Sequence, residues 1–431
     1  MISYIKIVNF RSIVEDVLRF TYDEGKAPNG GANDERLVFC EDAAAKRRCV
    51  PVQAIFGPNA AGKTNFLRAI VNLWDVAGGV RHPDVRSLYS PNLIAKCGDE
   101  TSFEVEFIED GQVYLYEIAY SRNGIRQEKL MVNGGLAYMV ENGQLSFGAV
   151  VNLTPVFTQE LFQERFTGEC SNGKGVVVKS FLGFFYRSFK AVSSEIASAY
   201  ELLIGKTMVI GLDRDHILPK AVNELCKAAN ITEGVALARI VDIVRRLDVD
   251  IQAIDIKTEK VDPHKPQVRL LAEAGIPVPE VLYSIRSHHM DTEGKDVVFD
   301  FETLESAGTV NLAALVGYLL CAIETGATYF MDELEMSLHP LLVRELLNLF
   351  LKRELNPKGA QLVFTTQMTD IMEDSILRLS EVAIVSKNRF RGSKIRRLID
   401  LKNGGEDIRN VTNFRKRYLE GHYSGIPHSA L

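Results

Sequence analysis

Apolar and polar residues alternate along three short stretches in the first third of the chain. These stretches are Ile2–Ile7, Ser102–Ile108 and Val113–Tyr120, and Asp110-Gly111 separates the last two as a turn. A period of two is typical of β-strands that bury one face. We therefore predict an antiparallel β lobe in the N-terminal part of the protein.

The apolar spacing becomes helical in the middle of the chain and returns to short runs afterwards. Helices are predicted at Phe181–Leu203, Ile217–Ala229 and Gly234–Leu247. Strands are predicted near Ile251–Thr258, Val281–Ser287 and Val297–Phe301. This pattern favours three parts: an N-terminal lobe of residues 1–150, a mainly helical insertion of residues 151–260 and a C-terminal lobe of residues 261–431.

One glycine-containing loop lies between an apolar run, Val50–Phe56, and an amphipathic helix pattern, Asn65–Val76. The loop reads Gly57-Pro58-Asn59-Ala60-Ala61-Gly62-Lys63-Thr64, which fits Gly-x-x-x-x-Gly-Lys-[Ser/Thr] at every fixed position. Glycines let consecutive N–H groups point at a phosphate, and the following helix adds its positive N-terminal end. The order strand, loop, helix therefore predicts a nucleoside triphosphate site. Lys63 would reach the β- and γ-phosphates, and the Thr64 hydroxyl would bind Mg²⁺.

Composition and charge narrow the class of protein. The 431 residues, 46% hydrophobic and 25% charged, suit one large domain with an insertion or two domains. A net charge of −6 gives no overall attraction to nucleic acid. Six cysteines without a Cys-x-x-Cys pair or a preceding secretory signal predict reduced thiols in a cytoplasmic protein. The apolar run Val310–Ile323 is shorter than the ~20 residues that cross a bilayer, so we expect a core helix and no membrane partner.

A short apolar strand in the last third of the chain, Ala327–Met331, ends in the acidic pair Asp332-Glu333. Asp332 would hold Mg²⁺ together with Thr64, and Glu333 would polarise the attacking water as a general base. Upstream, Ser306 and Gly308 stand directly before a predicted helix. They form either a second anion site or a simple helix cap, and the residues alone do not decide between the two.

Five segments together resemble a known family: FGPNAAGKTN, LESAGT, YFMDELEMSLHP, QLVFTT and YLEGHYSGIP. They are similar to ABC-type ATPases of the OLD and SMC-like superfamily, and more narrowly to the abortive-infection ATPases of bacterial anti-phage systems. The resemblance is strong over Ile2–Thr64 and Phe299–Pro427 and thin through the middle. It implies an α/β fold: an ABC-type P-loop ATPase head with a mixed central sheet, an N-terminal antiparallel β lobe and a helical insertion.

The resemblance also implies how the site is completed. ATP and Mg²⁺ would bind at Gly57–Asn65, with Asn65 included from the family motif. Ser306 and Gly308 of a second copy would face the γ-phosphate, so that ATP is held between two heads of a head-to-tail homodimer or a larger assembly. The segment Leu334–Pro340 would then cross the interface. His339 is expected as an interface or helix-start residue, because His-Pro opens the helix Leu341–Leu351.

One position departs from the family pattern. The family usually places a histidine after the strand Gln361–Thr365, and this chain has Gln367 there. An amide can donate a hydrogen bond to phosphate but does not titrate. We therefore expect a slow ATPase that works as a nucleotide-gated switch. The glutamine-bearing loop of the family has no clear counterpart, and Tyr89–Leu93 is the working guess for its place.

The favoured function is an ATP-dependent sensor and scaffold that controls a separate toxic effector, such as a nuclease, in response to a phage protein. The alternative is a DNA-repair or chromosome-organising ATPase that binds DNA directly, although the middle block lacks sustained heptads. A third reading is a metal-dependent nuclease that uses Asp213 and Asp215, for which no completing glutamate strand is found.

Two weaker signals have both a functional and a structural interpretation. Six basic residues lie between Lys387 and Arg397 with no acid among them. They could contact a nucleic-acid backbone, but aromatic residues for stacking are nearly absent, so an edge hairpin with Gly392 in its turn is preferred. His288-His289 lacks partners at metal-ligand spacing and is interpreted as a polar strand end.

Overall fold

A computed structural model describes the greater part of the chain. The described residues are 1–22, 39–42, 47–79, 81–82, 84–95, 98–172, 175–210, 217–247, 250–262, 265–273, 281–335, 338–373, 376–388, 392–403, 406–407 and 414–423. The chain forms two compact units. The first comprises Met1–Asp213, Gly326–Glu335 and Leu347–Leu431, and the second comprises Arg214–Thr325 and Met336–Leu346.

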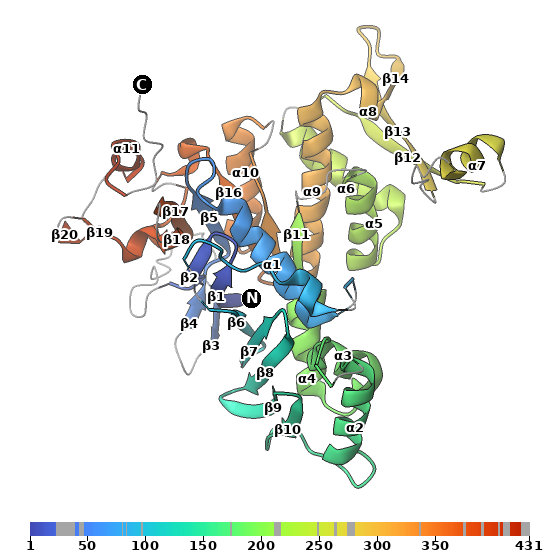
Figure 1. The fold of residues 1–431 in the computed structure, drawn as a ribbon. Coiled ribbons are helices and arrows are strands. Elements are labelled where there is room, and N and C mark those ends of the chain that lie inside the picture. Colours follow the sequence, from blue (N-terminus) through green and yellow to red (C-terminus); the bar gives the residue numbers. More distant parts are fainter. Residues whose placement is uncertain are drawn as a thin grey trace. The chain divides into compact units, whose positions relative to one another are not determined.

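Thirteen strands of the described chain form one sheet in the first unit (Figure 1). They are β1 (Ile2–Phe10), β2 (Ile13–Arg19), β5 (Val52–Phe56), β6 (Thr101–Glu109), β7 (Gln112–Ser121), β8 (Gly124–Val132), β9 (Gly135–Glu141), β10 (Gln144–Phe147), β11 (Thr207–Ile210), β15 (Thr328–Met331), β16 (Gln361–Thr366), β17 (Val382–Asn388) and β18 (Gly392–Arg397). Their order across the sheet is β10-β9-β8-β7-β6-β1-β2-β18-β17-β5-β16-β15-β11.

The sheet changes character between its two ends. Strands β10 to β2 pair antiparallel, and short turns connect all these pairs except β6 with β1, whereas β17, β5, β16, β15 and β11 run parallel. Strand β5 and strand β15 are buried along their whole length, as parallel strands covered on both faces are. The mixed α/β fold with an N-terminal antiparallel lobe is therefore confirmed, and the lobe and the parallel core share one sheet.

The helices of the first unit cover both parts of this sheet. They are η1 (Val85–Leu88), α1 (Lys63–Gly78), α2 (Gln159–Cys170), α3 (Phe181–Phe189), α4 (Ser194–Tyr200), the π-helix η2 (Glu201–Gly205), the short 3₁₀ turns η3 (Thr369–Ile371), η4 (Leu379–Glu381) and η5 (Leu398–Asp400), and α11 (Phe414–Leu419). Two small ribbons, β3 (Phe39–Asp42) with β4 (Arg47–Cys49) and β19 (Lys402–Asn403) with β20 (Glu406–Asp407), complete the described elements of this unit. Figure 1 shows α2, α3 and α4 beside the β8–β10 end of the sheet.

The second unit is a helical group with a small sheet. Its elements are α5 (Ile217–Ala229), α6 (Glu233–Arg246), β12 (Ala253–Lys260), α7 (Pro266–Glu273), β13 (Val281–Met290), β14 (Asp296–Asp300), α8 (Phe301–Leu304) and α9 (Ala307–Thr325). Helix α10 (Pro340–Leu351) begins in this unit and ends in the first. Helix α9 packs against α5 and α6, and a Cβ at Gly317 would lie 3.0 Å from Ala221 and 3.1 Å from Ile240. Among the described helices, α9 alone has the length and apolar composition to span a membrane; it is largely buried in the protein, as expected for a core helix.

Most sequence-predicted elements are present, and the exceptions have local causes. The predicted helix Phe181–Leu203 is wrong as one element, because α3 ends at Phe189 and the Ser193 hydroxyl starts α4 by accepting from the Ile196 N–H. Strand β11 lies inside the segment expected to be helical. The two units therefore have other boundaries than the three predicted parts.

A buried carboxylate fixes α3 to the sheet. Glu128 of β8 is fully buried and accepts hydrogen bonds from the Phe181 N–H (2.7 Å), the Leu182 N–H (2.9 Å) and the hydroxyls of Tyr138 (2.8 Å) and Ser180 (2.9 Å). Burial raises the pKa of Glu128, whereas the two backbone donors lower it. Each carboxylate oxygen accepts from a backbone N–H. A glutamine side chain in this place would put its NH₂ group, which is a donor, against one of these two N–H donors.

We expect Glu128→Gln to lower the free energy of unfolding by about 1–3 kcal/mol, because one buried N–H loses its acceptor. Urea denaturation at neutral pH measures the change. Glu117→Gln on the neighbouring strand is the control. Its carboxylate is half-exposed and paired with Lys129 at 3.1 Å, so we expect a change below about 1 kcal/mol. Equal stability of Glu128→Gln and the wild type would contradict the role of this carboxylate.

Candidate functional site

The predicted phosphate loop follows β5 and leads into α1, as the sequence requires. Its two outer glycines lie where no side chain fits. A Cβ at Gly57 would be 2.6 Å from the Val385 carbonyl oxygen, and one at Gly62 would be 2.3 Å from Ser393 Oγ. Gly62 also has φ = 115°, a region that other residues rarely adopt, and it caps α1. The loop is thus pressed against β17 and β18.

Two serines that sequence reasoning missed hold this loop from behind. Ser393 Oγ donates to the Ala61 carbonyl oxygen at 2.6 Å and lies 2.8 Å from Ser12 Oγ. Asn65 Nδ2 in turn donates to Ser12 Oγ at 2.8 Å. No motif marked either serine, because each is recruited by strand pairing across the sheet. The exposed tip of the loop is Asn59 and Ala60, and Ala60 has φ = 62°.

Lys63 lies across the loop. Its ammonium donates to the carbonyl oxygens of Gly57 (2.7 Å) and Pro58 (3.3 Å), and its side chain is almost wholly buried. Burial lowers the pKa of Lys63, and the neighbouring carboxylates of Asp332, Glu333 and Glu335 raise it. One cation therefore faces three acidic side chains at this edge of the sheet.

The structure brings Thr64 together with the acidic pair that follows β15. Thr64 Oγ1 donates to Asp332 Oδ2 at 3.0 Å, and Thr365 Oγ1 of β16 donates to Asp332 Oδ1 at 2.5 Å. The Glu333 N–H donates to the same Thr365 hydroxyl at 2.9 Å, while Glu333 has φ = 50°. A hydroxyl beside a carboxylate is a donor set that suits Mg²⁺, so these residues fit the expected ion. Sequence reasoning missed Thr365.

Gln367 lies directly after β16, on the same edge. Its side chain is exposed, and its backbone N–H donates to Glu335 Oε1 at 2.6 Å. Of the segment Leu334–Pro340, residues 336 and 337 lie outside the described residues. His339 Nδ1 accepts from the Leu341 N–H at 3.3 Å, which agrees with the expected helix-start role.

Ser306 and Gly308 belong to the second unit. Ser306 is exposed, and its hydroxyl accepts from the Thr309 N–H at 3.1 Å and lies 2.9 Å from Thr309 Oγ1. It therefore caps α9. Gly308 lies inside the first turn of α9 rather than before the helix. Ser306 is exposed although it caps α9, so a second molecule can reach its hydroxyl.

The carboxylate next to Ser306 is held by β13. Glu305 Oε1 accepts from Ser287 Oγ and from His289 Nε2, each at 2.5 Å. His288 instead lies on the strand between Asp296 and Asp255, and hydrogen bonds to Asp296 and then Asp255 raise its pKa. Among the described residues, no cluster of three or more His, Cys, Asp or Glu side chains could hold a metal ion. Asp213 and Asp215 lie outside the described residues.

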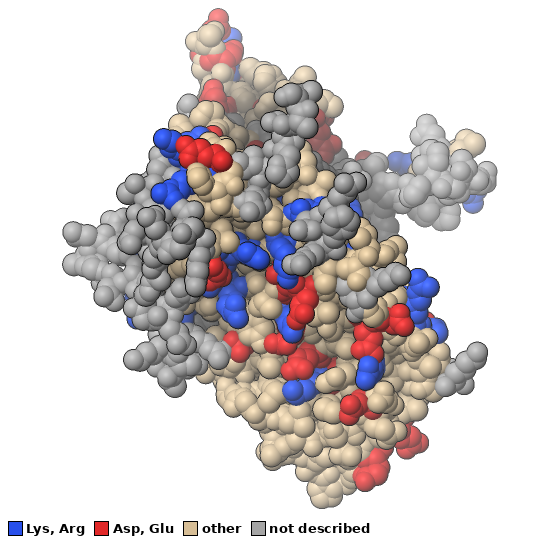
Figure 2. Space-filling view, turned by 60° about the vertical axis from the view of Figure 1, so that its left-hand side comes forward, with Lys and Arg blue, Asp and Glu red and all other residues tan. Residues whose placement is uncertain are grey.

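The basic cluster lies on an antiparallel hairpin of β17 and β18, as interpreted, but its predicted place at the edge of a sheet is wrong. Strand β18 lies between β2 and β17, inside the sheet. Arg397 is buried and pairs with Asp400 at 2.8 Å, Lys394 Nζ donates to the Glu15 carbonyl oxygen, and residues 389–391 are not among those described. On the face shown in Figure 2, blue Lys and Arg side chains are interspersed with red Asp and Glu. Two of the described basic residues, Arg397 and Lys394, are therefore engaged in contacts within the protein.

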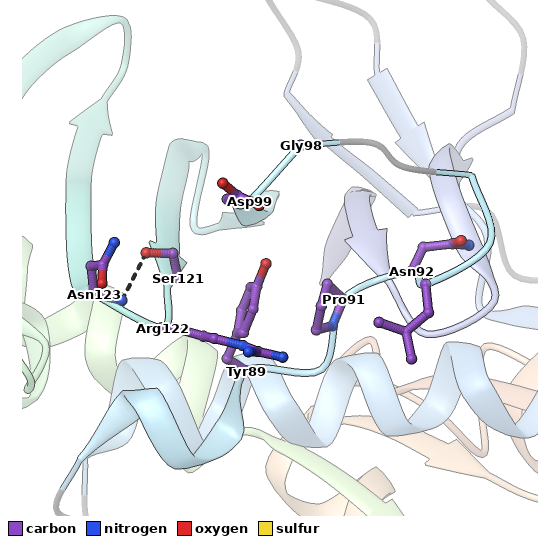
Figure 3. A pocket seen from close by; sticks show the side chains of 9 residues that line it. Tyr89, Pro91, Asn92, Gly98, Asp99, Ser121, Arg122 and Asn123 are labelled. Atoms are coloured by element: carbon purple, nitrogen blue, oxygen red, sulfur yellow. Dashed lines mark hydrogen bonds between the residues drawn. The ribbon is translucent and has the colours of Figure 1, made fainter.

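The segment Tyr89–Leu93 lines a pocket of about 570 Å³ (Figure 3). Arg122 lies 5.8 Å from the centre of the Tyr89 ring, and Asn92 Oδ1 accepts from the N–H groups of Ile94 and Ala95. The Arg11 N–H donates to the Ser90 carbonyl oxygen, which ties this segment to the turn that carries Ser12. No glutamine occupies the segment, so the place of the glutamine-bearing loop stays a prediction.

The four cysteines whose thiols the structure describes are Cys49, Cys170, Cys226 and Cys321, and all four are free. They agree with the predicted reduced state at these positions. Burial raises the pKa of the Cys170 thiol to about 12. We assign no chemistry to them.

A family model described as an AAA domain, putative AbiEii toxin, Type IV TA system, matches residues 52–138 and 229–372. These residues make up more than half of the chain and include the phosphate loop, Ser306, the acidic pair and Gln367. No curated protein matches the chain significantly.

Several solved structures are similar at low identity. One is an SMC head bound to the C-winged helix domain of ScpA, at 15% identity over 92% of this chain and 97% of that chain, with a TM-score of 0.45. The SMC head domain of Thermotoga maritima matches at 14% identity over 92% and 98%, with a TM-score of 0.39. A third is the Smc head with an extended coiled coil bound to the C-terminal domain of ScpA from Pyrococcus furiosus, at 14% over 92% and 95%, with a TM-score of 0.37.

Thr365 provides a test of the site geometry. We expect Thr365→Val to slow the ATP hydrolysis predicted from the sequence by about tenfold or more, because Asp332 and the Glu333 N–H both lose their shared hydroxyl. Thr365→Ser keeps the hydroxyl and serves as the control. Steady-state hydrolysis measures the effect, alongside thermal unfolding of each variant. A valine variant that hydrolyses ATP at the wild-type rate would show that the hydroxyl does not organise the site.

Proposed function

This chain belongs to the AAA-domain family described as putative AbiEii toxin, Type IV TA system, and we propose that it is a slow, ATP-hydrolysing switch that dimerises around its nucleotide. The observation that carries the proposal is the contact of Thr64 with Asp332 beside the buried Lys63. A hydroxyl, a carboxylate and an ammonium converge at the carboxyl edge of parallel strands. Ligands bind at this edge in open α/β sheets.

Each residue has a separate task in the proposed reaction. Bound Mg²⁺ would supply charge neutralisation on the phosphates, and Thr64 and Asp332 are the residues that would hold it. Lys63 turns from the loop carbonyl oxygens to the β- and γ-phosphates, where its charge stabilises the developing negative charge. Glu333 accepts a proton from the attacking water as the water oxygen bonds to the γ-phosphorus and ADP leaves. The Thr365 hydroxyl holds the Asp332 carboxylate and the Glu333 backbone N–H in fixed positions relative to each other.

A second copy of the chain would complete the site. Exposure of Ser306 at the start of α9 supports this part of the proposal, since a hydroxyl at a helix N-terminus suits a phosphate of the partner's nucleotide. ATP would then join two heads, and hydrolysis would let them part.

The wider role is an expectation from the resemblance of the motifs to abortive-infection ATPases, and no single contact carries it. We propose that the protein acts in the cytoplasm as an anti-phage sensor and scaffold, and that it controls a separate toxic effector in response to a phage protein. Sequencing the neighbouring gene identifies a candidate effector. Co-purification of its product with this chain then tests that part of the proposal.

Lys63→Ala and Glu333→Gln separate binding from hydrolysis. We expect Lys63→Ala to abolish ATP binding or turnover, because the phosphates lose their buried cation. Glu333→Gln should still bind ATP but hydrolyse it at least about a hundredfold more slowly, since the amide cannot accept the proton. Calorimetry and light scattering measure affinity and mass. A Glu333→Gln protein that stays monomeric in saturating ATP would contradict the shared site.

Gln367→His tests the switch. We expect the imidazole to raise the turnover number by about threefold or more, because it restores the titrating group that the family places here. Gln367→Asn keeps a shorter amide and is the control. Rapid turnover by the wild type, unchanged in the histidine variant, would rule out a switch slowed by glutamine.

DNA binding separates the proposal from the direct DNA-clamping alternative. Because the described basic residues are partly used in internal pairs, we expect weak duplex affinity that ATP does not increase. Titration at several salt concentrations, with and without ATP, measures it. ATP-dependent affinity with a steep salt dependence would favour the alternative instead.

A further inference from the structure

Glu335 is a charged residue of this edge to which no motif assigned a role. It lies two residues after Glu333, in the segment that leaves β15. One carboxylate oxygen, Oε1, accepts from the Gln367 N–H at 2.6 Å. The other, Oε2, is buried and has no hydrogen-bond partner among the described residues.

This contact ties the segment that follows β15 to the segment that follows β16. One residue earlier, the Leu334 N–H donates to the carbonyl oxygen of Thr365 in β16 at 3.2 Å, and the Glu335 side chain extends the contact to Gln367. Beyond these points the β16 chain leaves the sheet, and its next turn is held by the Met368 N–H on Thr366 Oγ1. The Glu335 carboxylate therefore determines where the backbone of Gln367 lies.

The contacts of Glu335 use an acceptor oxygen of its side chain rather than its charge. A buried oxygen without a donor costs roughly 1–3 kcal/mol, and a neutral acceptor could hold the Gln367 N–H without that cost. The charge also stands close enough to Lys63 to raise the pKa of that ammonium, together with Asp332 and Glu333. A third carboxylate beside a phosphate site is unfavourable for anion binding, so the contribution expected from Glu335 is its hydrogen bond to the Gln367 N–H and not its charge.

We propose that Glu335 is a positioning residue that holds the Gln367 backbone against the loop after the acidic pair, so that the γ-phosphate end of the site keeps its geometry during hydrolysis. This inference rests on the proposed ATPase function. It goes further in assigning a second acidic residue, distinct from the general base, whose Oε1 acts as a hydrogen-bond acceptor. Glu335 would then link the segment after β16 with the segment after β15.

Two substitutions separate the hydrogen bond from the charge. Glu335→Ala removes the acceptor, whereas Glu335→Gln keeps an amide oxygen that can accept from the same N–H. Glu354→Ala removes an exposed glutamate of the same unit and is the matched control. Thermal unfolding of all three variants confirms that each is folded before kinetics are compared.

The first measurement is amide hydrogen exchange in peptides that cover 361–373, without nucleotide. We expect exchange at Gln367 to accelerate by about tenfold or more in Glu335→Ala and to stay within about threefold of the wild type in Glu335→Gln and Glu354→Ala. Unchanged exchange in Glu335→Ala would overturn the inference, because the amide would then need no side-chain acceptor.

The second measurement separates ATP affinity from single-turnover hydrolysis. In Glu335→Ala we expect the dissociation constant of ATP to change by less than about threefold and the hydrolysis rate to fall by about tenfold or more. Glu335→Gln should retain most of the rate. An equally inactive glutamine variant would overturn the inference, since charge rather than the hydrogen bond would then matter. If the wild type itself does not hydrolyse ATP, the proposed function fails and the exchange experiment alone decides the role of Glu335.

Discussion

The hydrogen bond between Thr64 and Asp332 joins two residues that are 268 positions apart, and the organisation of the site depends on it. It forms because β5, β16 and β15 are parallel neighbours, so that their carboxyl ends meet at one edge of the sheet. Strand β16 lies between the other two. Its Thr365 hydroxyl therefore reaches Asp332 and the Glu333 backbone at once. Any change in strand order or register would separate the hydroxyl of Thr64 from its carboxylate.

The same sheet also explains why the antiparallel lobe matters to the phosphate loop. Strands β2 and β18 pair at a single position, Ser393 with Ile13, and this junction places Ser12 and Ser393 behind the loop. The loop backbone is packed so closely against Ser393 that Gly62 cannot carry a side chain. The antiparallel lobe thus restricts the conformation of the phosphate loop through close packing as well as through hydrogen bonds.

Charge is unbalanced at this edge of the sheet. The carboxylates of Asp332, Glu333 and Glu335 face the ammonium of Lys63, and Lys63 is nearly buried. A divalent cation would offset the excess of negative charge and would permit a triphosphate to approach. The arrangement therefore favours binding of nucleotide and cation together rather than of either alone. The carboxylate of Glu305, next to Ser306, is held in a different way, by hydrogen bonds from Ser287 and His289.

Local patterns in the chain were enough to identify many elements and the chemistry of the loop. Period-two alternation located β1, β6 and β7, and the phosphate-loop spacing located the residues from Gly57 to Thr64, because both signals depend on neighbours along the chain. The acidic pair after β15 was visible for the same reason. The helix over Phe181–Leu203 was drawn too long, since its apolar spacing continues through the Ser193 cap.

Only the tertiary structure decided which distant residues support these motifs. Ser12 and Ser393 lie in no motif, and Thr365 and Glu335 lie in family segments that gave them no role, because each acts through a partner brought beside it by strand order. The basic segment near Arg397 was likewise misjudged, since its place inside the sheet depends on β2, almost four hundred residues away in the chain. The sequence by itself determined the phosphate loop, because residue spacing encodes it, and the resemblance of its motifs to a known family indicated the type of fold. Pairing across the sheet, which no spacing encodes, determined the geometry of the site.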